Sequence, residues 1–470
     1  MDMSQNATPT KSFAIESNSI DYVDASQRNG KVRDLFTLWF CTNIAPLAII
    51  TGAMAVQTFH LNIIGAFTAI VLGHFFGASV LALTSAQGPQ VGIPQMIQSR
   101  AQFGRYGALL VVIFTTLIYL GFFVSNIILS GKTLHTVVPS IPVPTATMIG
   151  AVTATLIGIV GYHFIHKFNK IGTWIMGGAL MLGFGLMIPH INAELLARGS
   201  FNLKGWFAMF CVCAIWQISF SPYTSDYSRY LPKEIGIFKP FLTTYLGAAL
   251  GTVFAFSFGM LAVSIMQVDD AMQAVKTVTG GFGSVLMVLF LCNIIGHNAM
   301  NLYGASLSFI TAFQTFAGRW MPSAMTRVVI SVLVLVCATG IALWASSGFV
   351  SYFLNFIFAL LFIMVPWAVI NLMDFYLINK QSYDIDSIFA HDGGIYGKFN
   401  GKALCTYFIG ILIQVPFLTN SFFTGPWANV IPDVDISWIV GILVTFVVYF
   451  VLNPAKKTQK VHLAQSKSFN

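Results

Sequence analysis

Long apolar runs without charge dominate this sequence. No Asp, Glu, Lys or Arg occurs within residues 35–99, 277–318 or 328–373. Because a helix that crosses a bilayer needs about 20 apolar residues, each run can hold about two such helices. A membrane β-barrel would instead show segments of about ten residues in which polar and apolar positions alternate. The pattern therefore predicts an all-α polytopic membrane protein.

The spacing of the apolar segments predicts twelve transmembrane helices. Their ranges are 35–57, 62–85, 107–130, 144–165, 171–190, 206–221, 239–265, 282–312, 325–345, 350–373, 404–421 and 437–453. The polar N-terminus, Met1 to Asn29, lacks the apolar core and cleavage site of a signal peptide, so we expect the first span to remain. The composition agrees, because only 9% of the residues are charged, against roughly 25% in soluble domains.

Basic residues are divided unequally between alternate loops. With the N-terminus inside, 20 of the 24 Lys and Arg residues fall on the inner side. The outer loops hold only Lys132, Arg198, Lys204 and Lys276. This distribution satisfies the positive-inside rule and predicts that both termini of a cell-membrane protein (inner or plasma membrane) are cytoplasmic. It also accounts for the net charge of +8 without a nucleic acid partner.

Two of the predicted spans are interrupted by residues that a passive helix avoids. Span 1 contains Asn43, Pro46 and Gly52, and span 6 runs into Pro222. Proline removes a backbone donor and clashes with the preceding turn, so each helix must bend or break. Broken helices in hydrocarbon are tolerated where they are buried in protein or line a watery cavity. Paired breaks at the start of two five-helix halves are typical of an inverted-repeat transporter with a substrate site near the midplane.

Aromatic and carboxamide side chains lie near these breaks at helical spacing. Phe122 and Asn126 are four residues apart in span 3, and Trp216 and Phe220 repeat this spacing in span 6. Span 8 contributes His297, Asn298 and Asn301. Nucleobases are commonly held by aromatic stacking and by hydrogen bonds to the ring edge, which these residue types can provide. Helix packing and interhelical hydrogen bonds are the alternative role for each of them.

Six segments match, in order along the chain, the motifs of one transporter family. They are WFCTNIAPLAIITGA (39–53), GPQVGIPQMIQSRAQFGRYGA (88–108), GYHFIHKFNKIGTW (161–174), SPYTSDYSRYLP (221–232), NAMNLYGASLS (298–308) and VPWAVINLMDFYLI (365–378). The chain thereby resembles the cytosine/purine permeases, the nucleobase:cation symporters. The resemblance implies a leucine-transporter-type fold, with a 5+5 inverted repeat and two extra C-terminal helices. It also implies alternating access to a central site.

The resemblance implies a division of the chain into a core and flanking parts. The expected parts are a cytoplasmic tail (1–33), a ten-helix core (34–375) of two repeats (34–190 and 205–375), a cytoplasmic loop (376–403), peripheral helices 11 and 12 (404–453) and a second cytoplasmic tail (454–470).

The family's substrate-binding residues fall on the positions that the polarity pattern had indicated. The helix 3 aromatic and amide match Phe122 and Asn126, although relatives usually carry Trp at the first position. The helix 6 aromatics match Trp216 and Phe220. The helix 8 amide matches Asn301, with Asn298 beside it.

Helix 8 also bears on the coupling ion. Sodium-coupled relatives place side-chain hydroxyls at positions that match Ile295 and Gly296, which carry none. The remaining oxygen candidates are backbone carbonyls of broken span 1, from Ala45 to Ile49. We therefore expect proton coupling, with His297 as the titratable candidate, and keep sodium coupling as the alternative.

These patterns together predict a secondary active transporter that imports an uncharged nucleobase-like heterocycle by cation symport. The alternatives are a sodium-coupled carrier of allantoin, a hydantoin or a vitamin-like ring, an amino-acid transporter of the same fold, and a channel or receptor. The sequence has no P-loop, paired catalytic carboxylates or metal-ligand spacing, so we expect no enzyme, cofactor or metal site. Both a monomer and a homo-oligomer are compatible with the sequence.

Overall fold

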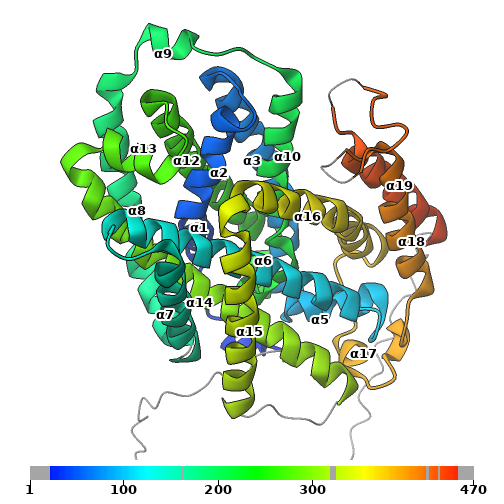
Figure 1. Cartoon of the computed structure of the whole chain (residues 1–470). Coiled ribbons are helices and arrows are strands. Elements are labelled where there is room, and N and C mark those ends of the chain that lie inside the picture. The colour runs from blue at the N-terminus through cyan, green and yellow to red at the C-terminus, as the bar shows by residue number, and fades with distance from the viewer. Residues whose placement is uncertain (1–21, 161, 318–323, 420–422, 432–433, 454–470) are drawn as a thin grey trace, which may run out of the picture.

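The computed structural model describes residues 22–453 apart from 161, 318–323, 420–422 and 432–433. Within these residues the regular secondary structure is helical, apart from two isolated β-bridges. Among the described residues, six helices are long and apolar enough to cross a membrane, and a bent pair makes a seventh span. Four shorter apolar helices accompany them. The protein is an all-helical, multi-pass membrane protein (Figure 1).

Each predicted span coincides with a helix or helix pair of the structure. These are α1 (Val32–Asn43) with α2 (Pro46–Gln57), α3 (Ile63–Ser85), α6 (Leu109–Val137), α7 (Val143–Val160), α8 (Tyr162–Met187), α10 (Leu203–Ile218), α12 (Phe238–Met266), α14 (Gly283–Phe316), α15 (Ala324–Ala345), α16 (Phe349–Leu372), α18 (Gly401–Leu412) and α19 (Ser437–Leu452). Some boundaries differ from the predicted ones: α6 continues to Val137, and α18 ends at Leu412. The predicted loop between spans 4 and 5 is part of α8, because residues 162–170 contain no Pro or Gly to end a helix.

The predicted break in span 1 lies between α1 and α2. The two helices meet at an angle of 58°. Ala45 is extended, with φ −132° and ψ 149°, and Pro46 opens α2. Proline suits this first position because its fixed φ fits a helix start and its missing N–H has no helical partner there. Two adjacent residues, Ala45 and Pro46, therefore determine the bend.

The second predicted interruption has a different form. The α10 helix ends at Ile218, and Pro222 lies in the 3₁₀ turn that follows (Ser221–Tyr223). A short helix, α11 (Thr224–Ser228), continues the chain. Span 6 thus tightens into a 3₁₀ turn, which is a common way for a helix to end, and it does not form a bent pair like that of span 1.

Glycines bring α12 into close contact with the bent span. A Cβ atom at Gly247, Gly251 or Gly259 would collide with the backbone of α1 or α2. These positions are four or eight residues apart and so share one face of α12. Small residues at such spacing let membrane helices approach closely. The bend is therefore supported along its length by a neighbouring helix.

Short helices connect the spans. They are α4 (Gly88–Val91), α5 (Gln95–Phe103), α9 (Ala193–Ala197), α13 (Ala271–Val278) and α17 (Ile385–Phe389). Every residue of α5 is buried, whereas the predicted spans place residues 86–106 between two membrane helices. Figure 1 shows α18 and α19 at one side of the bundle, beside α16.

Candidate functional site

A cavity lies where the bent first span meets three other helices. It encloses about 740 Å³, counted with the space open to solvent. Its walls come from the α1–α2 bend, α6, the segment from α10 to α11, and α14. Of the described residues that line it, none is Asp, Glu, Lys or Arg. A concave site with a mainly apolar wall and a few polar groups is typical of small-molecule binding.

Most of the residues proposed from the sequence lie along this cavity. The lining includes Phe122, Asn126, Trp216, Phe220, Asn301, His297 and Ala45. Asn298 does not line it, and both polar atoms of its side chain are buried without a hydrogen-bond partner in the described structure. Ile49 is fully buried and its carbonyl lies against Gly259 of α12. Asn298 and Ile49 are therefore buried beside the cavity and are not part of its lining.

The aromatic residues form one connected cluster. The rings of Phe122 and Phe220 are nearly parallel, with an interplanar angle of 4° and centroids 6.1 Å apart. Trp216 meets Phe122 edge to face at 5.8 Å. A planar ring inserted between two others needs a separation of about 7 Å, twice the contact distance of carbon atoms. A substrate must therefore stack on the outside of this cluster or move Phe122 and Phe220 apart.

Two carboxamides of the cavity wall are not used by the protein. Asn126 on α6 and Asn301 on α14 line the cavity, and neither has a hydrogen-bond partner among the described residues. Each carboxamide offers two donors and an acceptor oxygen. These groups can therefore bind the edge of a polar ring without first breaking an internal bond.

The last two residues of α1 are held by side chains from other cavity-lining elements. Trp216 donates from Nε1 to Oδ1 of Asn43 at 3.0 Å. On α14, His297 places Nε2 at 3.1 Å from the carbonyl oxygen of Thr42. The Nδ1 atom of His297 lies 3.1 Å from the carbonyl oxygen of Asn293, one turn earlier. The bend is thus in contact with both α10 and α14.

Three tyrosines of the cavity wall were not proposed from the sequence. Tyr119 and Tyr223 stack with centroids 4.8 Å apart and an interplanar angle of 25°. Tyr227 lies one turn beyond Tyr223 and also lines the cavity. Tyr119 precedes Phe122 by three residues, a spacing that places both on one helix face. That spacing is the sequence signal from which Tyr119 could have been predicted.

The chain is similar in sequence to known proteins over most of its length. Residues 22–441 match the model of a family described as permease for cytosine/purines, uracil, thiamine and allantoin. The chain is 35% identical to a putative purine-cytosine permease of Bacillus subtilis, over 93% of this chain and 96% of the relative. It is 21% identical to a purine-cytosine permease of Emericella nidulans, over 94% and 88% of the two chains.

Solved structures show the fold. Mhp1, a nucleobase-cation-symport-1 family transporter in a closed conformation with bromovinylhydantoin bound, is similar with a TM-score of 0.74 and 16% identity, over 93% of this chain and 95% of that one. A Na+-coupled sialic acid symporter is similar with a TM-score of 0.55 and 11% identity, over 90% and 98%. The predicted fold class is confirmed.

Proposed function

This chain belongs to the family of permeases for cytosine/purines, uracil, thiamine and allantoin, and we propose that it imports an uncharged nucleobase of the cytosine or purine type. It is a transporter and not an enzyme. The proposed mechanism is alternating access around the cavity at the α1–α2 bend, with a proton as the symported cation.

The observation that carries this proposal is the chemistry of the cavity wall. It combines an aromatic cluster with carboxamides, those of Asn126 and Asn301 among them, and the described residues that line it include no Asp, Glu, Lys or Arg. A charged substrate would lose its hydration there without an ionic partner, which costs far more than the transfer of a neutral ring. This favours a neutral planar heterocycle over an amino acid.

The contacts of His297 support proton coupling. Both ring nitrogens face backbone carbonyls, those of Asn293 and Thr42. Carbonyl oxygens only accept hydrogen bonds, and a neutral imidazole has a single N–H. Only the doubly protonated ring can donate to both. The other titratable groups that line the cavity are three tyrosines.

The candidate sodium ligands are engaged elsewhere. The carbonyl oxygen of Ala45 accepts the N–H of Ile49 at 3.2 Å. Ile295 and Gly296 of α14 have no side-chain oxygen. Sodium-coupled transport of allantoin, a hydantoin or a vitamin-like ring remains the second candidate function, favoured by the sodium-coupled symporter among the similar structures.

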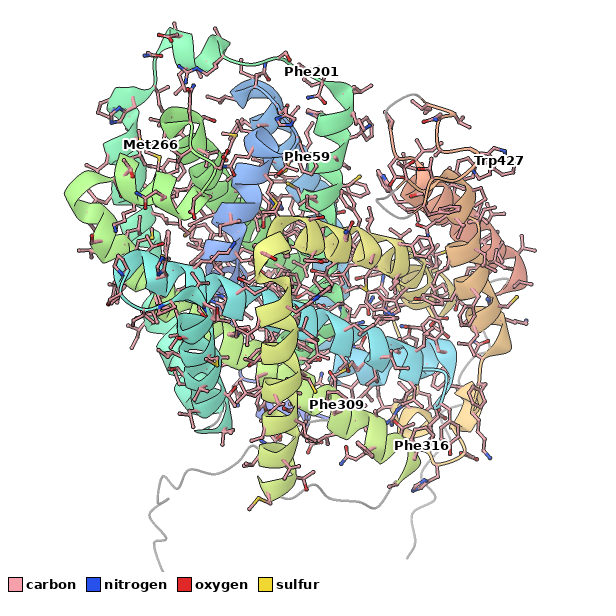
Figure 2. All side chains as sticks on the ribbon, viewed as in Figure 1. Phe59, Phe201, Met266, Phe309, Phe316 and Trp427 are labelled. Carbon is pink, nitrogen blue, oxygen red and sulfur yellow. The ribbon has the colours of Figure 1, made fainter. Side chains whose placement is uncertain are left out.

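We propose the same topology that the charge distribution predicts, with both termini cytoplasmic. Figure 2 places Phe59, Phe201 and Met266 toward one end of the molecule and Phe316 toward the other. Arg198, predicted to be outside, precedes Phe201 and contacts the carbonyl of Ser264. The end that carries Phe201 is therefore proposed to be extracellular.

The division into repeats is also a proposal. The core would comprise 34–190 and 205–375, each opening on an interrupted span. The segment 376–403 would be a cytoplasmic loop, and 404–453 would hold the peripheral helices, which lie at the side of the bundle in Figure 1.

Uptake of radiolabelled cytosine into proteoliposomes tests the proposed function. Proton and sodium gradients are imposed separately, with purines, uracil, allantoin and amino acids as competitors. We expect uptake driven by protons, inhibited by nucleobases and lost in Asn126→Ala and Asn301→Ala. Uptake driven only by sodium would refute the coupling ion and keep the site, whereas competition by amino acids would refute the substrate class.

A further inference from the structure

The bend in the first span takes the helical donor from backbone carbonyls at the end of α1, among them that of Thr42. In a continuous helix the N–H of residue 46 would donate to the carbonyl oxygen of Thr42, four residues earlier. Residue 46 is proline and has no N–H. Around the bend, Ile44 donates to Cys41 and Ile49 donates to Ala45. The Thr42 carbonyl therefore needs a donor from outside the helix, because an unpaired polar group in a membrane protein interior is costly.

His297 lies where that donor is needed. Its Nε2 atom is 3.1 Å from the Thr42 oxygen, across the cavity wall between α14 and α1. The hydroxyl of Thr42 does not compete for this position, since it donates to the carbonyl of Leu38. When the ring is doubly protonated, its Nδ1–H also donates to the Asn293 carbonyl.

We propose that His297 is a positioning residue whose Nε2–H replaces the backbone donor that Pro46 removes, and so holds the end of α1 at the bend beside the substrate cavity. The adjacent residue, Asn43, is held by Trp216 of α10. Two elements of the second half of the chain thus fix the bend of the first. If α1 moves relative to α14 during transport, the hydrogen bond between His297 and Thr42 must break, unless His297 moves together with the end of α1.

This role is separate from carriage of a proton and makes different demands on the side chain. A proton carrier must titrate, whereas a positioning donor needs only an N–H at the place of Nε2. The amide nitrogen of glutamine reaches the position of the imidazole Nε2, while that of asparagine reaches only the position of Nδ1. The pair His297→Gln and His297→Asn therefore differs by one methylene group and by the presence of the contact with Thr42.

The experiment compares both variants with the native protein in lipid nanodiscs. It measures equilibrium cytosine binding, thermal unfolding, and hydrogen–deuterium exchange of peptides that cover residues 40–50. In His297→Gln we expect unchanged exchange at the bend, and cytosine binding tighter than in His297→Asn. In His297→Asn we expect binding about tenfold weaker, as loss of one buried hydrogen bond implies, together with faster exchange at the bend.

The outcomes separate this proposal from the proposed function, on which its meaning for transport rests. Native-like binding and exchange in His297→Asn would overturn the positioning role and leave proton symport standing. Retention of proton-driven uptake in His297→Gln would refute His297 as the proton carrier and leave the positioning role intact. If the native protein binds no cytosine, the proposed substrate fails, while exchange at the bend still decides the positioning role.

Discussion

Asn298 is a residue whose surroundings do not match its chemistry. Both its amide nitrogen and its oxygen are buried without a hydrogen-bond partner in the described structure, and it lies behind the cavity wall. We expect Asn298→Leu to raise the melting temperature, because each unpaired buried polar group costs about 1–3 kcal/mol, and to leave cytosine uptake intact. Thermal unfolding and uptake assays measure the two effects.

Asn293→Leu provides the matched comparison for that prediction. Asn293 lies on the same helix and also has an unpaired buried oxygen, but it lines the cavity. We expect this variant to lower cytosine uptake. Loss of uptake in a folded Asn298→Leu protein would show instead that Asn298 takes part in binding, as the sequence pattern predicted.

Asn43 determines how the Trp216 ring is presented to the cavity. Its side-chain oxygen accepts the indole N–H, and its amide donates back to the carbonyl of Trp39 at 2.7 Å. We expect Asn43→Ala to weaken cytosine binding by about tenfold, because an unpaired indole N–H costs about 1–3 kcal/mol and the ring can rotate. Thr51→Val is the control, since Thr51 donates only to Leu47 of its own helix. Equal losses in both variants would contradict the prediction.

Helical spacing is what made part of the site predictable residue by residue. Phe122 and Asn126, like His297 and Asn301, are four apart, so any cavity on that face of the helix meets both members of a pair. Asn298 is not among the residues that line the cavity, because the face that α14 turns to the cavity depends on its neighbours, which the local sequence does not contain. The contact between His297 and Thr42 joins residues 255 apart and was invisible for the same reason.

At the scale of elements, a chain of side-chain hydrogen bonds joins the segment after span 6 to α5 and α16. Each member donates to the next, in one direction, over distances between 2.6 and 3.3 Å; the order is Ser225, Gln95, Gln87, Asn371, Gln102, Tyr383 and Asp374. Burial, with Asp374 next, raises the pKa of Tyr383, so its hydroxyl stays protonated and donates to the carboxylate. Hydrogen bonds aligned in this way strengthen one another.

Breaking this chain at its middle tests how strongly it holds these elements together. Gln87→Leu leaves Asn371 without its donor and Gln95 without its acceptor, at about 1–3 kcal/mol for each group. We expect a markedly lower melting temperature. Gln90→Leu is the control, because the Gln90 amide nitrogen is buried without a partner in the described structure and its loss should not destabilise the protein. Similar melting temperatures for the two variants would argue against the chain.

The interrupted spans and the connecting helix α5 differed in how well the sequence predicted them. Proline disfavours a continuous helix, so the breaks near Pro46 and Pro222 were predictable, although not that one is a bend and the other a 3₁₀ turn. Pro366 shows the limit of this signal, because it lies inside the continuous helix α16. The α5 helix was missed because its polar residues resemble a loop. Gln95 and Gln102 are fully buried because nearby Gln87 and three residues from distant parts of the chain, Ser225, Asn371 and Tyr383, hydrogen-bond to their side chains.

For the whole molecule, hydropathy and the family resemblance were sufficient to predict an all-helical transporter fold, since apolar length and backbone hydrogen bonding leave few alternatives in a membrane. The orientation is the remaining global property, and it follows from charge alone. We expect a cysteine placed at Lys276 to react with a membrane-impermeant maleimide in intact cells. A cysteine placed at Lys398 should react only after the cells are opened. Labelling of the native protein measures the reaction of its own cysteines. The reverse labelling pattern would show that the topology is opposite to the proposed one, and the gradients of the uptake assay would then be imposed in the opposite direction.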